Sequence, residues 1–409
     1  MKKYYFFLLF GFFSCEVFAE EEVKPGILKQ LVEENAEEIQ AKESEVFHPK
    51  FTNRLVFEVV SNDEYQSTNR RDEFLDTRSK TRLYSSYNFA KYFSVNSFLK
   101  TEPSSQISET NRRNASSNGG GDRAFENEGI FVEELNLTFD SKKHAFVLGK
   151  FDLNFGSAWR WNRGIWTYDI AEQYKQREKL GINGIYRIGD SKKTGRYEFT
   201  YAAFTNDRKN LDNSTITGRD VDAKSDAVPG DTRSLKSYTT SLDINFDFSE
   251  KEKLAYHFSY INLAVNSRAS DVTPSYKIAR QKGYTAGLSY KYPVFENLLL
   301  DSLVEYASVK NLGGDSDIGE NYFTANTIAK FYKNWNVTLG YAQLDNSEVQ
   351  ATGFQRNLSE ISFGYEFKKN SFFDRLLFQV GYKNQRDDFK TSLESRNVWG
   401  GFVRYQKNF

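Results

Sequence analysis

The sequence predicts an all-β fold, a transmembrane antiparallel β-barrel of about 16 strands, because many segments approach the ~9–11 residues that a tilted strand needs to cross a bilayer. Three observations predict this fold. The chain opens with an export signal, short segments of alternating apolar and polar residues fill most of its length, and the last of these segments ends on Phe409. Each observation is weak alone, but the three agree on one architecture.

Residues 1–19 have the three parts of a secretory signal peptide. Two lysines follow the initiating Met, residues 4–13 are apolar, and residues 17–19 form a small-residue cleavage site. Cleavage before Cys15, as in a lipoprotein, is the alternative, but the preceding Phe-Phe-Ser fits that pattern poorly. Cys15 is the only cysteine, so the exported chain has no disulfide framework.

The composition combines a polar average with many aromatic residues. Mean hydropathy is −0.65, yet 16% of the residues are aromatic, with 36 Phe and 25 Tyr. No apolar run after the signal reaches the ~18–20 residues of a transmembrane helix. In a membrane barrel half of the strand residues face lipid and half face water, so hydropathy averages out while alternation remains. Basic and acidic residues balance at 55 each, and nothing points to nucleic acid as a partner.

Alternation is clearest in residues 237–248. Even positions hold Tyr, Thr, Leu, Ile, Phe and Phe, whereas odd positions hold Ser, Thr, Ser, Asp, Asn and Asp. Successive strand residues point to opposite faces, so one face suits lipid and the other suits water. Similar segments complete the predicted barrel: 53–60, 81–89, 92–100, 129–139, 144–151, 179–189, 195–205, 253–265, 282–292, 298–309, 321–332, 335–345, 359–367, 376–385 and 396–409.

The predicted connections alternate in length. Every second connection is short, beginning with residues 90–91 and 141–143, whereas the intervening ones are mostly longer. The longest are residues 61–78, 101–128, 152–177 and 206–234. Short periplasmic turns opposite long external loops are the rule for outer-membrane barrels. With an even number of strands, we expect both termini to be periplasmic.

The inward-facing positions are polar and charged, which predicts a water-filled lumen, as expected at ~16 strands. They are Arg54, Glu58, Arg82, Asn88, Glu134, Lys150, Asn183, Arg187, Asp243, Lys291, Glu305, Lys330, Glu360, Glu366, Lys383 and Arg404. A soluble β-sandwich is the alternative for alternating strands, but it would not explain the signal, the terminal Phe and the loop asymmetry together.

The connection 152–177 differs from the other long ones. It holds Trp159, Trp161 and Trp166, three of the five tryptophans, whereas 101–128 and 206–234 are rich in Ser, Asn, Gly and Asp. Such aromatic density is costly on a solvated loop, so we expect this loop to fold inward against the barrel wall.

The run Gly-Lys-Phe-Asp-Leu-Asn-Phe-Gly at 149–156 resembles the strand-to-loop entry of the general and phosphate-selective porins. The strand number and loop order are similar to those of this family across most of the chain. The resemblance implies a homotrimer of sixteen-stranded barrels whose third external loop constricts the lumen. The sequence departs from the phosphate-selective type because it has no obvious ladder of lumen arginines, so phosphate specificity is not expected.

Opposite charges across a narrow pore create a transverse field that sets ion preference. The predicted constriction consists of Arg160, Arg163, Asp169, Glu172 and Lys150. Closure of the barrel brings the last strand beside the first, which predicts a basic wall of Arg54, Arg82 and Arg404 facing the loop acids. The loop charges could instead pair with one another or point to solvent.

The predicted function is passive diffusion of small hydrophilic solutes and ions through an outer-membrane porin. One alternative is a substrate-selective porin for sugars or anions, in which Trp159, Trp161 and Trp166 form an aromatic slide. A hydrophobic-substrate channel is less favoured, because its amino-terminal hatch should be apolar and residues 20–50 are acidic.

An enzyme is not expected. The only histidines are His48, His144 and His257, none of which falls in a predicted external loop where an outer-membrane protease would hold its site. No metal-ligand cluster or phosphate loop appears, so no cofactor is predicted.

Residues 20–50 precede the predicted barrel, residues 51–409, as a periplasmic segment. A heptad-like pattern of Leu28, Val32, Asn35, Ile39, Lys42 and Val46 predicts either a short trimeric coiled coil or a solvated linker. The expected partners are outer-membrane lipid, the barrel-assembly machinery that would recognise Phe409, and two further copies of the chain.

Overall fold

The computed structural model describes residues 47–68, 73–103, 122–125, 128–161, 163–206, 229–230, 232, 234–265, 279–332, 334–348, 353–367, 375–389 and 392–409. The predicted signal peptide and residues 20–46 lie outside this part of the chain, as do most of the loops 101–128 and 206–234. Among the described residues, no helix has the length and apolar character required to cross a membrane.

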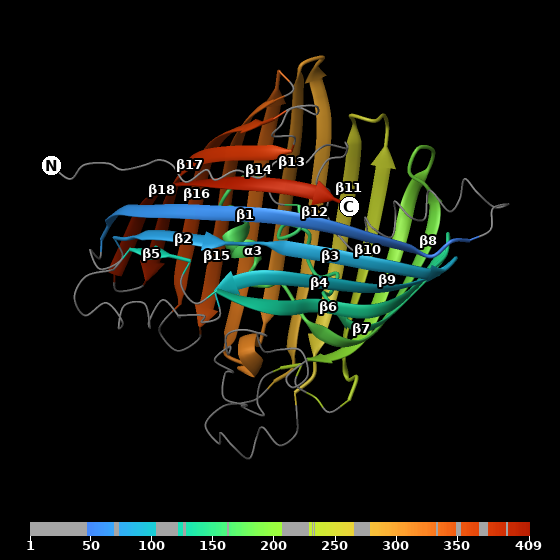
Figure 1. The fold of residues 1–409 in the computed structure, drawn as a ribbon. Helices are drawn as coiled ribbons and strands as arrows, with labels where there is room; N and C mark the ends of the chain where they lie inside the picture. Colours follow the sequence, from blue (N-terminus) through green and yellow to red (C-terminus); the bar gives the residue numbers. More distant parts are fainter. Residues whose placement is uncertain are drawn as a thin grey trace.

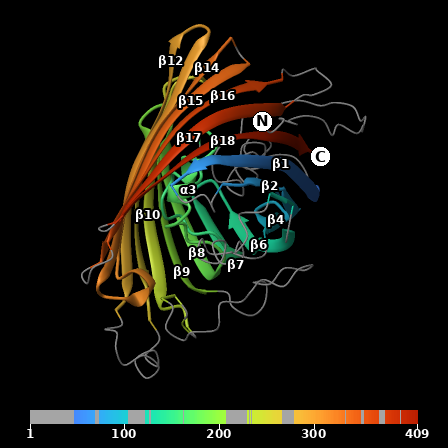
Figure 2. The ribbon, with the colours of Figure 1, turned by 90° about the vertical axis from the view of Figure 1, so that its left-hand side faces the viewer.

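The described chain forms one antiparallel sheet that closes into a barrel (Figures 1 and 2). Each of the sixteen predicted segments corresponds to a strand, so the predicted fold class is confirmed. The strands of the wall are β1 (Lys50–Ser67), β2 (Leu75–Ser79), β3 (Arg82–Ala90), β4 (Phe93–Pro103), β6 (Glu128–Asp140), β7 (His144–Phe151), β8 (Lys179–Asp190), β9 (Gly195–Asn206), β10 (Ser237–Asp247), β11 (Lys253–Leu263), β12 (Gln281–Phe295), β13 (Leu298–Lys310), β14 (Ile318–Phe331), β15 (Trp335–Glu348), β16 (Phe354–Glu366), β17 (Leu376–Phe389) and β18 (Ser392–Asn408).

Closure is made by β1 and β18, which lie side by side in Figure 1 at the blue and red ends of the chain. Their register runs from Arg54 opposite Asn408 to Ser67 opposite Arg396. Beyond β18, the amide of Phe409 donates to the carbonyl of Asn53 at 2.9 Å, and the Asn53 amide donates back at 2.8 Å. The aromatic terminal residue therefore completes the closing pair of strands.

The second wall strand is interrupted, and here one sequence prediction is wrong. β2 and β3 both pair with β1, and the amide of Lys80 between them donates to the carbonyl of Glu58 at 2.8 Å. β2 and β3 therefore count as one of 16 wall strands, and the two-residue β5 (Arg123–Ala124) pairs in parallel with β2 as the extra strand. Residues 61–67 and 75–78, predicted as part of an external loop, extend the wall because backbone pairing continues there.

Side chains alternate between a lipid-compatible exterior and a polar interior. On β17, Val380 is 57% exposed on the outside, whereas Gln379 is 4% exposed on the inside. Outward aromatic rings gather near the short turns: Phe93 contacts Phe139 at a centroid distance of 5.2 Å, and Trp335 stacks on Phe363 at 5.0 Å. An aromatic girdle of this kind is typical of barrels at the membrane interface.

A bulge in β6 places two acidic residues in succession on the inner face. Phe98 pairs with Glu134 and Leu99 pairs with Val132, so Glu133 has no partner residue on β4. An extra residue of this kind re-aims its side chain. Both Glu133 and Glu134 consequently line the lumen.

We predict that deleting Phe409 destabilises the barrel, because two backbone hydrogen bonds of the closing strand pair are lost. The free energy of unfolding should fall by about 1–3 kcal/mol, as measured by urea titration in detergent micelles. Phe409→Ala retains both backbone groups and is the matched control. An equal loss in both variants would show that the side chain, and not the pairing, stabilises the closure.

Candidate functional site in the barrel lumen

The barrel interior contains a cavity of about 960 Å³ whose lining is rich in charged side chains of both signs. The strands β1–β4, β6–β9 and β16–β18 contribute much of the lining, together with residues 151–177. At the end with the short turns, inward residues of β10–β15 complete it, among them Lys253, Lys291 and Lys330. A polar cavity of this size accommodates water and small hydrophilic solutes.

The loop between β7 and β8 lies inside the ring of strands. Its apolar residues Leu153, Phe155 and Ile170 are at most 1% exposed and pack against Leu303 and Leu344 of the inner wall. A short helix, α3 (Tyr168–Ala171), forms the middle of the loop and is visible within the barrel in Figures 1 and 2. One side of the loop is packed on the wall, so at the level of the loop the cavity lies between its other side and the strands β1–β9 and β16–β18.

The three tryptophans of this loop occupy different environments. Trp166 is 1% exposed, its indole Nε1 donates to Asn62 Oδ1 at 2.8 Å, and it does not line the cavity. Trp159 and Trp161 do line the cavity. The Trp159 ring is already covered by cations, with Lys175 Nζ at 4.2 Å and the Arg160 guanidinium carbon at 4.6 Å from the ring centroid.

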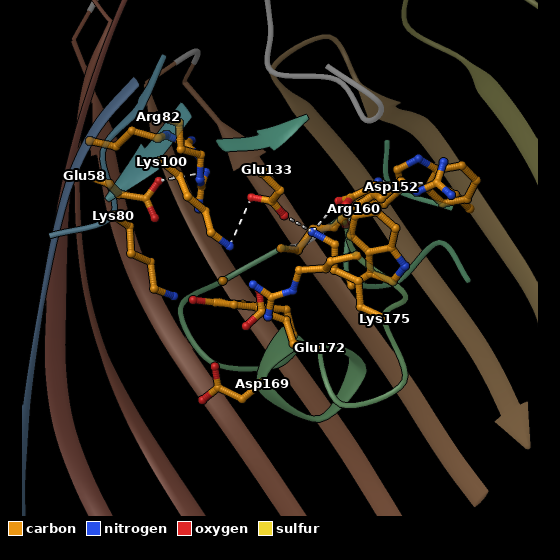
Figure 3. Close-up of a pocket in the computed structure, with 18 of the residues that line it drawn as sticks. Glu58, Lys80, Arg82, Lys100, Glu133, Asp152, Arg160, Asp169, Glu172 and Lys175 are labelled. Atoms are coloured by element: carbon orange, nitrogen blue, oxygen red, sulfur yellow. Dashed lines mark hydrogen bonds and ion pairs between the residues drawn. The ribbon is translucent and has the colours of Figure 1, made fainter. Parts of the chain in front are cut away.

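Two acidic residues of the loop, Asp169 and Glu172, face cations of the wall (Figure 3). Lys383 of β17 lies 3.8 Å from the Asp169 carboxylate, and Lys80 Nζ lies 4.4 Å from the centroid of the Tyr168 ring. The cavity at α3 therefore has anions on the loop side and cations on the wall side.

The two loop carboxyls differ in their pKa. Burial raises the pKa of Asp169 above its usual value, although Lys383 and Lys80 act in the opposite direction. Burial would also raise the pKa of Glu172, but Arg177 and Lys80 outweigh it and lower the pKa to about 2. Asp169 is therefore the loop carboxyl that takes up a proton first as the pH falls.

A chain of ion pairs joins the loop to β4 and β6. Lys100 lies 3.1 Å from one oxygen of Glu133, Lys175 lies 2.9 Å from its other oxygen, and Lys175 also lies 2.9 Å from Asp152 (Figure 3). The bulge that turns Glu133 inward thus supplies the central carboxylate. Burial opposes the charge of Lys175, yet Asp152 and Glu133 raise its pKa and keep it protonated.

The remaining residues of the predicted constriction have different surroundings. Arg163 lines the cavity and is paired with Asp301 of β13. Arg160 lines the cavity beside Trp159, and burial lowers its pKa. Lys150 does not line the cavity: its side chain is 0% exposed and its Nζ lies 2.9 Å from Glu178.

The predicted basic wall has a different composition in the structure. Arg82 and Arg404 line the cavity, with Arg82 3.5 Å from Glu58. Arg54 is 6% exposed, lies 5.4 Å from the Tyr84 ring and does not line the cavity. Arg78 and Lys80 also line the cavity beside Arg82, but they were not predicted, because Arg78 falls in the predicted loop 61–78 and the predicted second strand begins at residue 81, after Lys80.

Of the histidines, His257 of β11 lies behind the loop and outside the cavity lining. Its Nδ1 is 2.8 Å from Asp243 Oδ1, and the other oxygen of Asp243 accepts a hydrogen bond from Asn154 Nδ2 at 2.7 Å. This polar group therefore helps to pack the loop. No group of His, Cys, Asp and Glu suited to a metal ion occurs among the described residues.

Comparison with solved structures relates this architecture to outer-membrane channels. The outer membrane channel DcaP of Acinetobacter baumannii aligns with a TM-score of 0.53 and 12% sequence identity, covering 88% of this chain and 97% of that one. The chain has the fold of an outer-membrane channel. An anion-selective porin from Comamonas acidovorans aligns with a TM-score of 0.49 and 10% identity over 88% of this chain and 99% of that one. No family model matches the sequence, and a search of curated proteins finds no similar sequence.

We predict that acidification shifts the ion preference of the barrel lumen toward anions, because protonation of Asp169 removes one negative charge facing Lys383 and Lys80. Reversal potentials in a salt gradient, recorded between neutral pH and about pH 4, measure the shift. Asp169→Asn should show the anion preference already at neutral pH and lose most of the shift. Glu172→Gln is the contrasting variant, since Glu172 remains ionised over this range. A pH response that persists unchanged in Asp169→Asn would assign it to another group.

Proposed function

We propose that the protein is a porin of the bacterial outer membrane through which small hydrophilic solutes and ions diffuse passively. The observation that carries this proposal is the charged cavity of about 960 Å³ enclosed by the sixteen-stranded wall and bounded by an inward loop. Charged side chains along a lumen stabilise water and ions, whereas an apolar solute would have to displace their hydration. A channel for hydrophobic substrates is therefore less favoured.

The loop 152–177 is proposed to form the constriction. Asp169 and Glu172 on one side and Lys80, Arg82 and Lys383 on the other supply opposite charges at the level of α3. A field between such groups orients passing dipoles and discriminates between ions. Arg160 and Arg163 add positive charge on the loop, while Lys150 supports the constriction from behind through its pairing with Glu178.

The chain direction and the predicted export signal support a membrane orientation in which both termini are periplasmic. Lys50 and Asn408 lie at the end of the barrel that carries the short turns, which we infer to be periplasmic. Outer-membrane lipid would surround the outward aromatic and aliphatic side chains. Phe409, paired with Asn53, is the proposed signal for the barrel-assembly machinery.

A substrate-selective porin is the second candidate, for sugars or anions. It is favoured by Trp159 and Trp161, which line the cavity beside Arg160 and Lys175. Trp166 cannot take part in an aromatic slide because its side chain is buried between the loop backbone and the barrel wall. No chemical step is proposed, since the buried His257–Asp243 pair lies outside the cavity lining.

We predict stepwise, ohmic conductance when the folded protein is reconstituted into a planar lipid bilayer, because the lumen is charged and hydrated. Addition of sugars and small organic anions then separates the two candidates. A general porin is blocked only at high concentration, whereas a selective one shows saturable block at low concentration. Well-inserted, heat-modifiable protein that remains silent across a range of voltages would refute both.

A homotrimer is proposed from the outer surface of β1, β3 and β4. Asn53, Ser85 and Ser97 lie opposite one another in register on the outward face, and Ser85 Oγ donates to Asn53 Oδ1 at 2.7 Å. Polar groups facing lipid are costly, whereas they are acceptable where a second protein covers them. This row is the proposed centre of the contact between copies.

We predict a trimeric mass in mild detergent by light scattering after subtraction of the detergent. Ser97→Trp should yield monomers, since the bulky side chain would prevent close approach of the β4 faces. Ser302→Trp is the matched control, because Ser302 also faces outward but lies on β13. A monomeric wild-type protein would rule out the trimer, and equal effects of both substitutions would place the contact elsewhere.

A further inference from the structure

Two glutamates of the barrel wall, Glu360 on β16 and Glu305 on β13, each receive a cluster of hydrogen bonds from the inward loop. Neither was predicted to do more than face the lumen. Glu360 is 4% exposed and Glu305 is 1% exposed, so each carboxylate is enclosed between the wall and the loop. A buried carboxylate is tolerated only where donors converge on it.

Glu360 binds three consecutive backbone amides of the loop. Its oxygens accept from the amides of Ile165, Trp166 and Thr167 at 2.5, 2.8 and 2.8 Å, and from the Thr167 hydroxyl at 2.7 Å. Successive amides that point to one anion form a nest, a motif that binds charge strongly. The preceding Gly164 has φ +92°, and a Cβ there would lie 2.3 Å from Glu360 Oε1. Glycine is therefore required for the backbone to wrap around this carboxylate.

Glu305 binds the first part of the same loop. Its Oε2 accepts from the Ser157 amide at 2.6 Å and from the Ser157 hydroxyl at 2.5 Å, and its Oε1 accepts from the Ala158 amide at 3.0 Å. Tyr174, on the returning part of the loop, donates its hydroxyl to Oε1 as well. One carboxylate thus joins the outgoing and returning parts of the loop to β13.

The inner wall is shaped to receive the loop at these points. A Cβ at Gly340 would lie 2.0 Å from Thr167 Oγ1, and one at Gly400 would lie 2.6 Å from the Trp166 ring. Glycine weakens a strand interior, so its presence on the inward face indicates close approach of another chain segment. The loop is consequently seated against the wall at the same level at which Glu360 holds its backbone.

We propose that Glu360 and Glu305 are positioning residues that set the open width of the pore by holding the loop 152–177 against the wall at β13–β16. The inference rests on the proposed porin function. With these hydrogen bonds intact, the loop stays on the β13–β16 side, and its acidic residues face the cavity toward Lys80 and Lys383. Without them, the loop loses its backbone attachments to the wall at residues 157–158 and 165–167, and α3 with its two acids moves relative to Lys80 and Lys383.

The test combines single-channel recording with hydrogen exchange on the full-length trimer or monomer as purified. In Glu360→Gln and Glu305→Gln, one carboxylate oxygen becomes an NH2 group that faces donors. We expect faster exchange of the amides at 165–167 in Glu360→Gln and of those at 157–158 in Glu305→Gln. Both variants should show altered single-channel conductance, more open-channel noise and weaker ion selectivity, with strand amides still protected. Glu366→Gln is the control for the exchange measurement, because Glu366 lies on the same strand and lines the cavity, yet its side chain forms no hydrogen bond or ion pair with the described residues of the loop; the loop amides should exchange as in the wild type.

A second pair of variants keeps the test informative if the glutamine variants do not fold. Gly340→Ala leaves both carboxylates intact but forces Thr167 away from the wall, so it should reproduce the effect of Glu360→Gln. Thr167→Cys with Gly340→Cys places two Cβ atoms 3.1 Å apart, below the ~3.5–4.5 Å of a disulfide, so the bond forms after a small outward shift of the loop. The oxidised pair, built into Glu360→Gln, should slow the exchange of the loop amides and reduce the open-channel noise of that variant, and reduction should abolish both effects. Cys15 in the predicted signal peptide is the only natural cysteine, so no other thiol of the mature chain competes.

The outcomes separate this inference from the proposed function. A wild-type barrel that folds but does not conduct refutes the porin. A conducting wild type whose Glu360→Gln, Glu305→Gln and Gly340→Ala variants match it in conductance, noise and selectivity refutes the positioning role. Faster loop exchange without any electrical change also refutes it, because the loop would then be released without affecting the pore.

Discussion

The constraint on which this structure depends is the need to satisfy every backbone amide and carbonyl in a medium without water. A sheet in lipid cannot have a free edge, so the first and last strands must pair along their length. The register between β1 and β18 spans from Arg54 to Ser67, and the exchange between Asn53 and Phe409 extends it to the end of the chain. Because this closing pair is antiparallel, the number of wall strands is even, and the first strand begins at the same end of the barrel at which the last strand ends.

Closure with so many strands creates a second requirement, because the interior is too wide for wall side chains to fill. The loop between β7 and β8 fills part of this space. Its apolar residues pack on one side of the wall and its charged residues face the other side, where Lys80, Arg82 and Lys383 lie. The position and lining of the polar lumen therefore depend on the side of the barrel against which the loop packs.

The sequence predicted the barrel well, because alternation has a period of two and reports directly which face meets lipid. It located all sixteen wall segments, and the aromatic density of 152–177 indicated a loop that packs on the wall.

The sequence-based prediction failed where the structure departs from regular alternation or depends on distant partners. The break at Lys80 concealed Arg78 and Lys80, and the parity of Arg54 did not reveal that this side chain lies against Tyr84 and not in the cavity. The role of Glu360 could not be read from its own strand, because its partners are backbone groups of a loop almost two hundred residues away. The inward glycines at 340, 381 and 400 were the available signal, since a strand facing only water has no need of them.

The bulge in β6 affects which insertions and deletions the barrel wall can accept during evolution. In a regular strand, losing one codon transfers every following side chain to the opposite surface, so lipid-facing and water-facing residues exchange places. Glu133 is the supernumerary residue, and its loss would leave Val132 and Ile130 outside and Phe131 inside, as they are now. The central carboxylate of the ion-pair chain can therefore be gained or lost in a single event without disturbing the membrane surface. At this one position, an insertion or a deletion can change the charge of the lumen without changing which side chains face the lipid.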